Sequence, residues 1–220
     1  MSNPSSIAEP STGPPRDIVT GIDLQQQELR QRILAVAKHK FSRFGYDGTP
    51  LVDVAENSGV SMAELLEQFG SKLGLLQAVF DAAWATINPR IADIVIGSAS
   101  ARDATYSIMS LMMHILEKDE DLARLMLFES RRPNPETGEI LLPAGYLELL
   151  RICHEVIARG QKDGSFSVIL HPLVIMSTLI GAAEGLLRDR MIAEQEGHSM
   201  PYTESQLIVA FGKLVSFLKP

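Results

Sequence analysis

Apolar residues recur every three or four positions along most of the chain, which is the spacing of one face of an α-helix. The first such face carries Leu29, Ile33, Val36, Ala37, Phe41 and Phe44, and it ends at Gly45. The same spacing predicts further helices over residues 50–57, 61–69, 71–84, 89–98, 101–118, 120–131, 144–161, 172–195 and 203–218. We find no convincing run of alternating residues, so the predicted fold class is all-α with about nine or ten helices.

Two short helices near the N-terminus are separated by a turn that contains Gly59. Thr49 is the predicted N-cap of the first, with Pro50 at the first helical position. Ser61 is the predicted N-cap of the second, and Glu64 three residues later completes a capping box. A longer helix precedes the pair, which makes a helix-turn-helix unit.

Composition and charge narrow the class of protein. Residues 1–22 are rich in Ser and Pro, lack a signal peptide's apolar run, and are expected to form a disordered tail. A net charge of −7 excludes a generic nucleic-acid binder, so any affinity for DNA must come from a local patch. The single Cys153 excludes an intrachain disulfide and favours the cytoplasm. The stretch 173–187 is too short to span a membrane and contains Glu184, so no membrane contact is expected.

One string of residues identifies a family. Over about residues 28–80 the chain resembles the TetR family of transcriptional regulators, through Arg32-Ile33-Leu34, Ala37, Phe41, Gly45-Tyr46, Thr49, Val52, Val54-Ala55, Ser58-Gly59-Val60-Ser61, Leu65, Phe69, Ser71-Lys72 and Leu75-Leu76. The resemblance implies a DNA-binding domain at residues 23–70 and a helical effector-binding and dimerisation domain at residues 71–220. The implied function is a homodimeric repressor that a small, largely apolar effector releases from a double-stranded DNA operator.

The resemblance also implies which residues meet the DNA: Thr49, Ser61, Met62, Ala63, Leu66, Glu67, Gln68 and Lys72. Met62 and Leu66 stand where the family usually has phosphate-binding Lys and Tyr, and Glu67 adds a negative charge. Residues 24–87 hold six Lys and Arg against seven Asp and Glu, a net charge of −1. The alternative is therefore a TetR-fold ligand-binding or protein-interaction module that has lost DNA binding. Glu64 is either a cap or a base reader, and Gln68 is either solvated or pairs with adenine.

The C-terminal region offers candidates for a pocket and for a dimer interface. Methionine and aromatic side chains adapt to apolar ligands or simply fill the core, and the candidates are Tyr106, Met109, Met113, Met126, Phe128, Tyr146 and Met176. Dimerisation in the family uses the last two long helices. The spacing of Gly181 and Gly185 permits close helix approach there. The predicted interface residues are Gly181, Gly185, Phe211, Leu214 and Leu218.

Enzymatic function is not expected, because the chain lacks a phosphate-binding glycine loop, a Gly-x-Ser-x-Gly nucleophile motif and a His-Glu-x-x-His helix. No cofactor is predicted. No metal site is predicted either, since adjacent residues such as His154 and Glu155 point about 100° apart on a helix.

Overall fold

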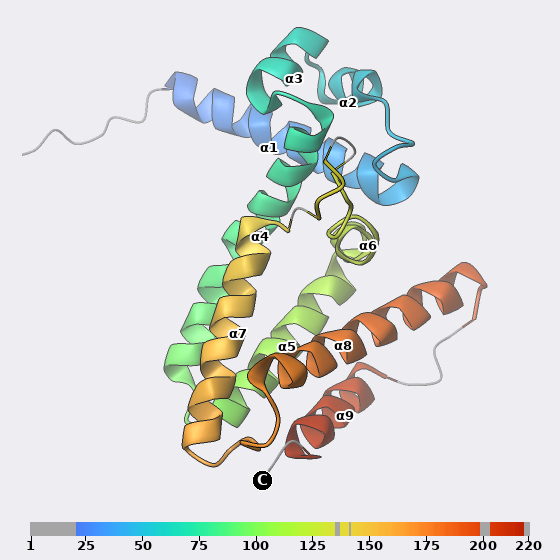
Figure 1. Ribbon diagram of the computed structural model, residues 1–220. Coiled ribbons are helices and arrows are strands. Elements are labelled where there is room, and N and C mark those ends of the chain that lie inside the picture. The colour runs from blue at the N-terminus through green and yellow to red at the C-terminus, as the bar shows by residue number, and fades with distance from the viewer. Residues whose placement is uncertain (1–20, 135–136, 141, 199–202, 218–220) are drawn as a thin grey trace, which may run out of the picture.

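The computed structural model describes residues 21–134, 137–140, 142–198 and 203–217, and helices dominate them. Nine helices form in these residues, namely α1 (Gly21–Phe44), α2 (Leu51–Ser58), α3 (Met62–Phe69), α4 (Lys72–Gly97), α5 (Ala101–Lys118), α6 (Glu120–Phe128), α7 (Ala144–Lys162), α8 (Pro172–Gln195) and α9 (Glu204–Phe217) (Figure 1). The predicted all-α fold is confirmed, and the bounds of α5 and α8 are those predicted. Most of the predicted tail lies outside the described residues.

Helices α1, α2 and α3 form the helix-turn-helix unit at one end of the molecule (Figure 1). Gly59 ends α2 with a φ of 69°, the left-handed conformation that glycine adopts without a steric penalty. Val60 then returns its N–H to the carbonyl of Ala55, which closes the turn. The tight turn fixes the angle between α2 and α3.

The predicted N-cap at Thr49 is wrong. Pro50 occupies the cap position of α2, and no side chain caps that helix end. Thr49 is fully buried, and its hydroxyl donates to the carbonyls of Gly45 (2.8 Å) and Lys40 (3.2 Å) at the end of α1. A buried hydroxyl must find such acceptors, so Thr49 closes the C-terminal end of α1 instead of opening α2.

Helix α4 continues unbroken through Pro89, so the predicted separate helix at residues 89–98 is wrong. An internal proline removes one helical hydrogen bond and costs about 3 kcal/mol. Pro89 itself is exposed, whereas Ile87 and Ile91 on either side of it are buried. Burying each of these isoleucines contributes about 1.5–3 kcal/mol, which offsets the cost of the proline.

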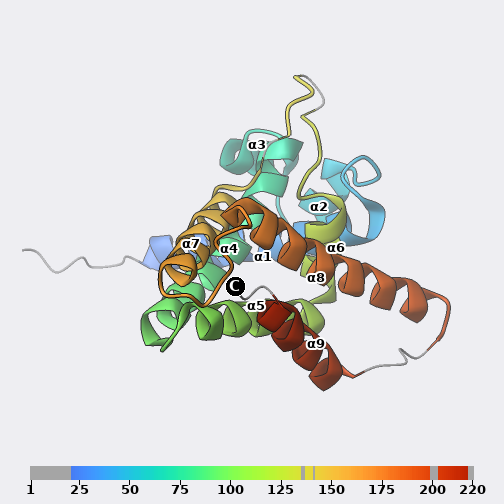
Figure 2. The same ribbon diagram turned by 60° about the horizontal axis from the view of Figure 1, so that its bottom comes forward.

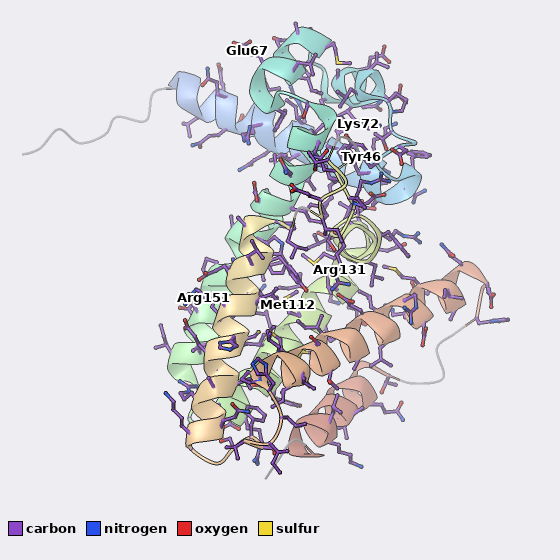
Figure 3. The ribbon with its side chains drawn as sticks, viewed as in Figure 1. Tyr46, Glu67, Lys72, Met112, Arg131 and Arg151 are labelled. Carbon is purple, nitrogen blue, oxygen red and sulfur yellow. The ribbon has the colours of Figure 1, made fainter. Side chains whose placement is uncertain are left out.

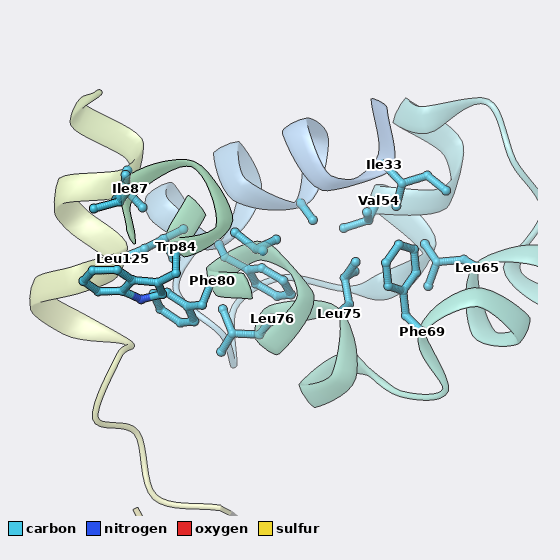
Figure 4. Packing of buried hydrophobic residues seen from close by; sticks show 14 of the residues in the cluster. Ile33, Val54, Leu65, Phe69, Leu75, Leu76, Phe80, Trp84, Ile87 and Leu125 are labelled. Atoms are coloured by element: carbon cyan, nitrogen blue, oxygen red, sulfur yellow. The ribbon is translucent and has the colours of Figure 1, made fainter. Parts of the chain in front are cut away.

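One hydrophobic cluster extends from the helix-turn-helix unit into the rest of the molecule (Figure 4). At one end, Ile33 of α1, Val54 of α2 and Leu65 of α3 meet. The cluster continues along α4 and reaches α6 through Leu75, Leu76, Phe80, Trp84, Ile87 and Leu125. The two predicted domains therefore share one core, and α4 is the element common to both.

The remaining helices build the body around the second half of α4. Helix α7 packs along α4 and α5, and α8 crosses α7 (Figure 1). Helix α9 returns against α5 and α8, while the C-terminal half of α8 extends beyond its neighbours (Figure 2). Among the described residues, no helix has the length and apolar character needed to cross a bilayer.

The contact between α4 and α7 gives a test of this packing. A Cβ on Gly145 would overlap the side chain of Trp84, so Gly145→Ala should lower the free energy of unfolding by about 1–3 kcal/mol. Urea denaturation at fixed protein concentration measures it. The control is Gly97→Ala, because no atom lies within 4 Å of its added Cβ. Equal stability of the two variants would contradict the close approach of α7 to α4.

Candidate functional site

Helix α3 presents an exposed face that is largely apolar. Leu65 and Phe69, four residues apart, are buried against the neighbouring helices, so the opposite face is turned to solvent. That face carries Met62, Ala63, Leu66 and Glu67, with Gln68 half-buried beside it (Figure 3 labels Glu67). Met62 and Leu66 are 38% and 39% exposed. Such a face can touch methyl groups and hydrogen-bond donors, but it offers no cation of its own.

The N-terminus of α3 is closed by a capping box, which confirms the structural interpretation of Glu64. The Glu64 N–H donates to the Ser61 hydroxyl (3.2 Å), and the Ser61 N–H donates to the Glu64 carboxylate (2.7 Å). The hydrogen bond from the Ser61 backbone holds the pKa of Glu64 below its ordinary value. Glu64 thus supplies the anion that this helix end favours, and an external phosphate at the Ser61 amide would compete with it.

Lys72 lies at the start of α4, over the ring of Tyr46. Its Nζ is 4.7 Å from the ring centroid and donates to the carbonyl of Asp47 at 3.3 Å. Partial burial lowers the pKa of Lys72. The ammonium group remains beside the turn between α1 and α2, within the helix-turn-helix unit (Figure 3).

Tyr46 is the centre of a junction between the helix-turn-helix unit and the end of α6. We call this set the Tyr46 junction; its members are Tyr46, Asp47, Lys72, Glu129 and Arg132. The Tyr46 N–H donates to Glu129 (3.0 Å), and the Arg132 guanidinium lies 4.9 Å from the ring centroid. Arg132 also donates to Glu129 (2.7 Å) and Asp47 (2.9 Å), and the bond to Glu129 raises the pKa of Arg132. The junction ties α6 to the turn that precedes α2.

Arg131, next in sequence to Arg132, makes its contacts within the body instead. Its guanidinium donates two hydrogen bonds to the carboxylate of Glu184 in α8, at 2.6 and 2.9 Å. A third donation reaches the hydroxyl of Tyr146 in α7, at 3.3 Å. These bonds raise the pKa of Arg131, with Glu184 the largest cause. Consecutive arginines therefore connect the end of α6 to the body on one side and to the helix-turn-helix unit on the other.

An apolar cavity of about 100 Å³ lies inside the body, walled by α4, α5, α6, α7 and α8. Its polar groups are few, and Ser130, Tyr146 and Glu184 bring them together near Arg131. Phe80 and Trp84 of α4 form one wall and Met112 of α5 belongs to another. An apolar space with a few convergent polar groups has the lining that is typical of a small-molecule site.

The model of the bacterial regulatory proteins, tetR family, matches residues 33–79. That match runs from α1 through both short helices into α4 and includes the exposed face of α3 and Lys72. Over residues 33–79 the chain is therefore similar to the TetR family. The comparison with curated proteins finds no match.

Solved structures share the fold over most of the chain. The transcriptional regulator FadR from Bacillus subtilis, in complex with stearoyl-CoA, is 18% identical with a TM-score of 0.71, covering 84% of this chain and 97% of its own. The fatty acid degradation regulator FadR from Bacillus halodurans is 15% identical with a TM-score of 0.69, covering 86% and 94%. The ketosteroid regulator KstR2 of Mycobacterium tuberculosis is 15% identical with a TM-score of 0.66, covering 87% and 95%. The likeness extends the TetR-family fold over the body as well.

The structure distributes the predicted pocket residues over three places. Four line the 100 Å³ cavity, namely Met109, Met113, Met126 and Tyr146. Met176 lines a smaller cavity beside it. Tyr106 and Phe128 line neither: Tyr106 faces Gly212 of α9, and Phe128 is exposed at the end of α6. Methionine content alone cannot separate these positions, because the direction in which each side chain points depends on the neighbouring helix.

Several cavity residues were not predicted. Phe80 and Trp84 lie on the apolar face of α4, and that periodicity marks them as core without marking a cavity. Glu184 and its partner Arg131 are 53 positions apart, so no local pattern joins them. Cys153 also lines the cavity, and burial raises the pKa of its thiol to about 12, which keeps it protonated and unreactive. Among the described residues, no group of three His, Cys, Asp or Glu is placed to hold a metal ion.

The described residues leave one face of helix α8 uncovered. Leu173 and Val174 are exposed there, and Gly181 has no atom within 4 Å of an added Cβ. Gly185, one turn further on, has only the end of Arg188 nearby. Of the other predicted interface residues, Leu214 packs against the apolar cluster of α5, α7 and α8. Only the backbone of Phe211 is described, and Leu218 lies outside the described residues.

The Tyr46 junction gives a second test. Arg132→Ala would leave the Glu129 carboxylate, which is 8% exposed, without its guanidinium partner. We expect the free energy of unfolding to fall by about 1–3 kcal/mol in urea denaturation. Arg124→Ala in α6 is the matched control, because its partner Glu120 is 64% exposed and such pairs contribute less than about 1 kcal/mol. If the two variants lose the same free energy of unfolding, the Tyr46 junction adds no more stability than an exposed ion pair.

Proposed function

We propose that this TetR-family regulator binds a pseudo-palindromic DNA operator as a homodimer and that a small, largely apolar effector releases it. The observation that carries this proposal is the shared core: α4 starts in the helix-turn-helix unit and then forms a wall of the apolar cavity. Residues 23–70 act as the DNA-binding domain and residues 71–220 as the effector-binding and dimerisation domain. We assign the protein no catalytic role. We infer that it acts in the cytoplasm, because the operator that we propose for it is DNA.

The exposed face of α3 supports a mode of DNA binding that relies little on charge. In the major groove, Met62, Ala63 and Leu66 would contact thymine methyl groups, and Glu67 would accept from the amino group of cytosine. Gln68 would pair with adenine if its half-buried amide turns outward. Ser61 lies at the start of the same helix. Thr49 instead holds the end of α1, and its buried hydroxyl cannot reach DNA.

Phosphate contacts must then come from outside α3. Lys72 lies in the Tyr46 junction beside the turn that precedes α2, and release of counterions by such cations supplies much of the affinity for DNA. The acidic α3 leaves few of them, so we expect modest affinity with a shallow dependence on salt, because few counterions are released.

Effector binding would reach the DNA-binding domain by two connections. The first is α4, whose Phe80 and Trp84 face the cavity while Leu75 belongs to the core of the helix-turn-helix unit. The second is the end of α6, where Arg131 contacts the cavity side and Arg132 the Tyr46 junction. An effector that repositions either connection would change the angle of α3 to the operator, and its differential affinity for the two arrangements sets how far it can shift them.

The comparisons support an apolar effector but leave its shape open. FadR from Bacillus subtilis was solved with stearoyl-CoA, which has a linear chain, and KstR2 is a ketosteroid regulator. The same fold therefore serves ligands of different shapes, and the cavity of this chain must decide between them.

The uncovered face of α8 is the proposed dimer interface. Exposed Leu173 and Val174 continue into the small residues Gly181 and Gly185, which allow a second helix to approach closely. Dimerisation would place two copies of α3 at the spacing of successive major grooves, about 34 Å apart.

DNA binding is tested first with an operator selected from random duplexes. Lys72→Ala should weaken binding to all sequences alike and reduce the slope of log affinity against log salt by about 1, because one phosphate contact is lost. Fluorescence anisotropy at several salt concentrations measures both. Lys162→Ala, at the far end of α7, is the control and should change neither. If no duplex is selected even at low salt, the chain is a TetR-fold module that does not bind DNA.

The interface is tested with Gly181→Arg. Beyond its own helix backbone, no described atom lies within 4 Å of the added Cβ, so the fold should tolerate the arginine while a closely packed partner helix should not. Light scattering after size exclusion should show a dimer for the unmodified protein and a monomer for this variant. Gly97→Arg, also without a close neighbour, should remain a dimer. A Gly181→Arg dimer would place the interface elsewhere.

A further inference from the structure

Two further cavities border the apolar cavity of the body. A second, inner cavity of about 30 Å³ shares Ile108, Met109, Cys153 and Ile180 with it. A third, more polar cavity of about 320 Å³ shares Phe80 and Ser130 with it on another side. The three spaces are thus neighbours with lining side chains in common.

Their order along α7 shows that they lie in a row. The inner cavity is lined from Cys153 to Ile157, the central one from Tyr146 to Cys153, and the polar one ends at Ala144. At 1.5 Å per residue, this row follows α7 for about 20 Å. Helix α4 repeats the order, since Trp84 lines only the central cavity and Leu73 only the polar one.

The shape of the row selects among apolar ligands. A rigid polycyclic molecule needs one wide chamber, whereas the inner cavity holds only about 30 Å³ and shares Met109 and Cys153 with the central one. A flexible chain of methylene groups can pass such side chains one carbon at a time. Methionine adjusts its rotamers easily, so Met109 and Met176 can yield to a chain without unfolding the helices.

The polar groups mark which end of the ligand lies where. The inner cavity is lined by apolar side chains apart from Thr105, whose hydroxyl is already bonded to the carbonyl of Ala101. Ser130, Tyr146 and Glu184 instead line the central cavity away from the inner one, and Arg131 binds both Tyr146 and Glu184 there. A ligand with one polar end would place it there and send its apolar end inward.

We propose that the effector is a long, unbranched aliphatic chain with one polar end, lying along α7 with its head at Ser130, Tyr146 and Arg131 and its tail at Met176. This proposal rests on the proposed function, because it names the effector of the same regulator. A free carboxylate and a thioester share this chemistry. A bulky head on a thioester would continue into the polar cavity. Its polar lining residues are Gln77, Asp81, Glu129, Ser130, Arg132 and Asn134.

The first experiment maps the ligand on the unmodified full-length protein. Two palmitic acid probes carry a photoreactive diazirine, one near the carboxyl group and the other at the last carbons. After irradiation, mass spectrometry of the peptides should place the head probe on 126–146 and the tail probe on 153–157 or 175–180. Labelling of both ends on the same peptide, or of surface residues alone, would overturn the proposed orientation.

The second experiment uses chain length. Calorimetry with saturated fatty acids from 8 to 16 carbons should show affinity rising roughly fourfold per methylene until the row is filled. Met176→Trp fills the inner cavity, so it should abolish the gain for the longest chains while keeping that for the shortest. Met176→Leu keeps the space and should behave like the unmodified protein. Affinity that does not rise with chain length would contradict the proposal, as would tighter binding of androstenedione, a rigid polycyclic ketone.

Two further comparisons use the same assay. One distinguishes a free fatty acid from a thioester as the ligand, and the other tests the regulator function separately from ligand binding. Palmitic acid and palmitoyl-CoA are compared: tighter binding of the thioester favours a head in the polar cavity, and equal or weaker binding favours the free acid, both within the proposal. Release of the selected operator is measured in parallel. Binding of a long chain without release would support this inference and contradict the proposed function. Release of the operator by androstenedione alone would contradict this inference and support the proposed function.

Discussion

The continuity of α4 is the constraint on which the rest of the structure depends. Its first turns pack Leu75 and Leu76 into the core of the helix-turn-helix unit, and Phe80 and Trp84 then face the cavity. Because burial of the flanking isoleucines offsets the cost of Pro89, the helix does not break where its sequence allows it to. A change at the cavity would therefore reach the helix-turn-helix unit through one packed helix.

The end of α6 supplies a second, polar connection. Arg131 and Arg132 are neighbours in sequence, yet one binds Glu184 in the body and the other binds Glu129 and Asp47 at the Tyr46 junction. These contacts are charge-assisted hydrogen bonds, which have narrow geometric limits. A polar ligand head beside Arg131 would compete with Glu184 and so act directly on the peptide segment that carries Arg132.

Part of the negative charge of α3 is used to cap its own N-terminus. The carboxylate of Glu64 is held by the Ser61 N–H, so its charge completes the helix end and is not directed at a ligand. What remains outward is a short apolar face with Glu67 beside it. That surface suits readout of methyl groups and leaves phosphate binding to cations outside the helix.

The sequence by itself determined the all-α class, the helix-turn-helix unit and the capping box at Ser61, because helical periodicity, left-handed glycine and capping depend on residues within a few positions of each other. It predicted four of the cavity residues by their chemistry, including Met109 and Tyr146, but grouped them with Tyr106, which faces α9. Only the tertiary structure decided the burial of Thr49, the passage of α4 through Pro89, and the pairing of Arg131 with Glu184. Each of these depends on packing between segments distant in sequence, and local pattern holds no information on which side chains such packing brings together.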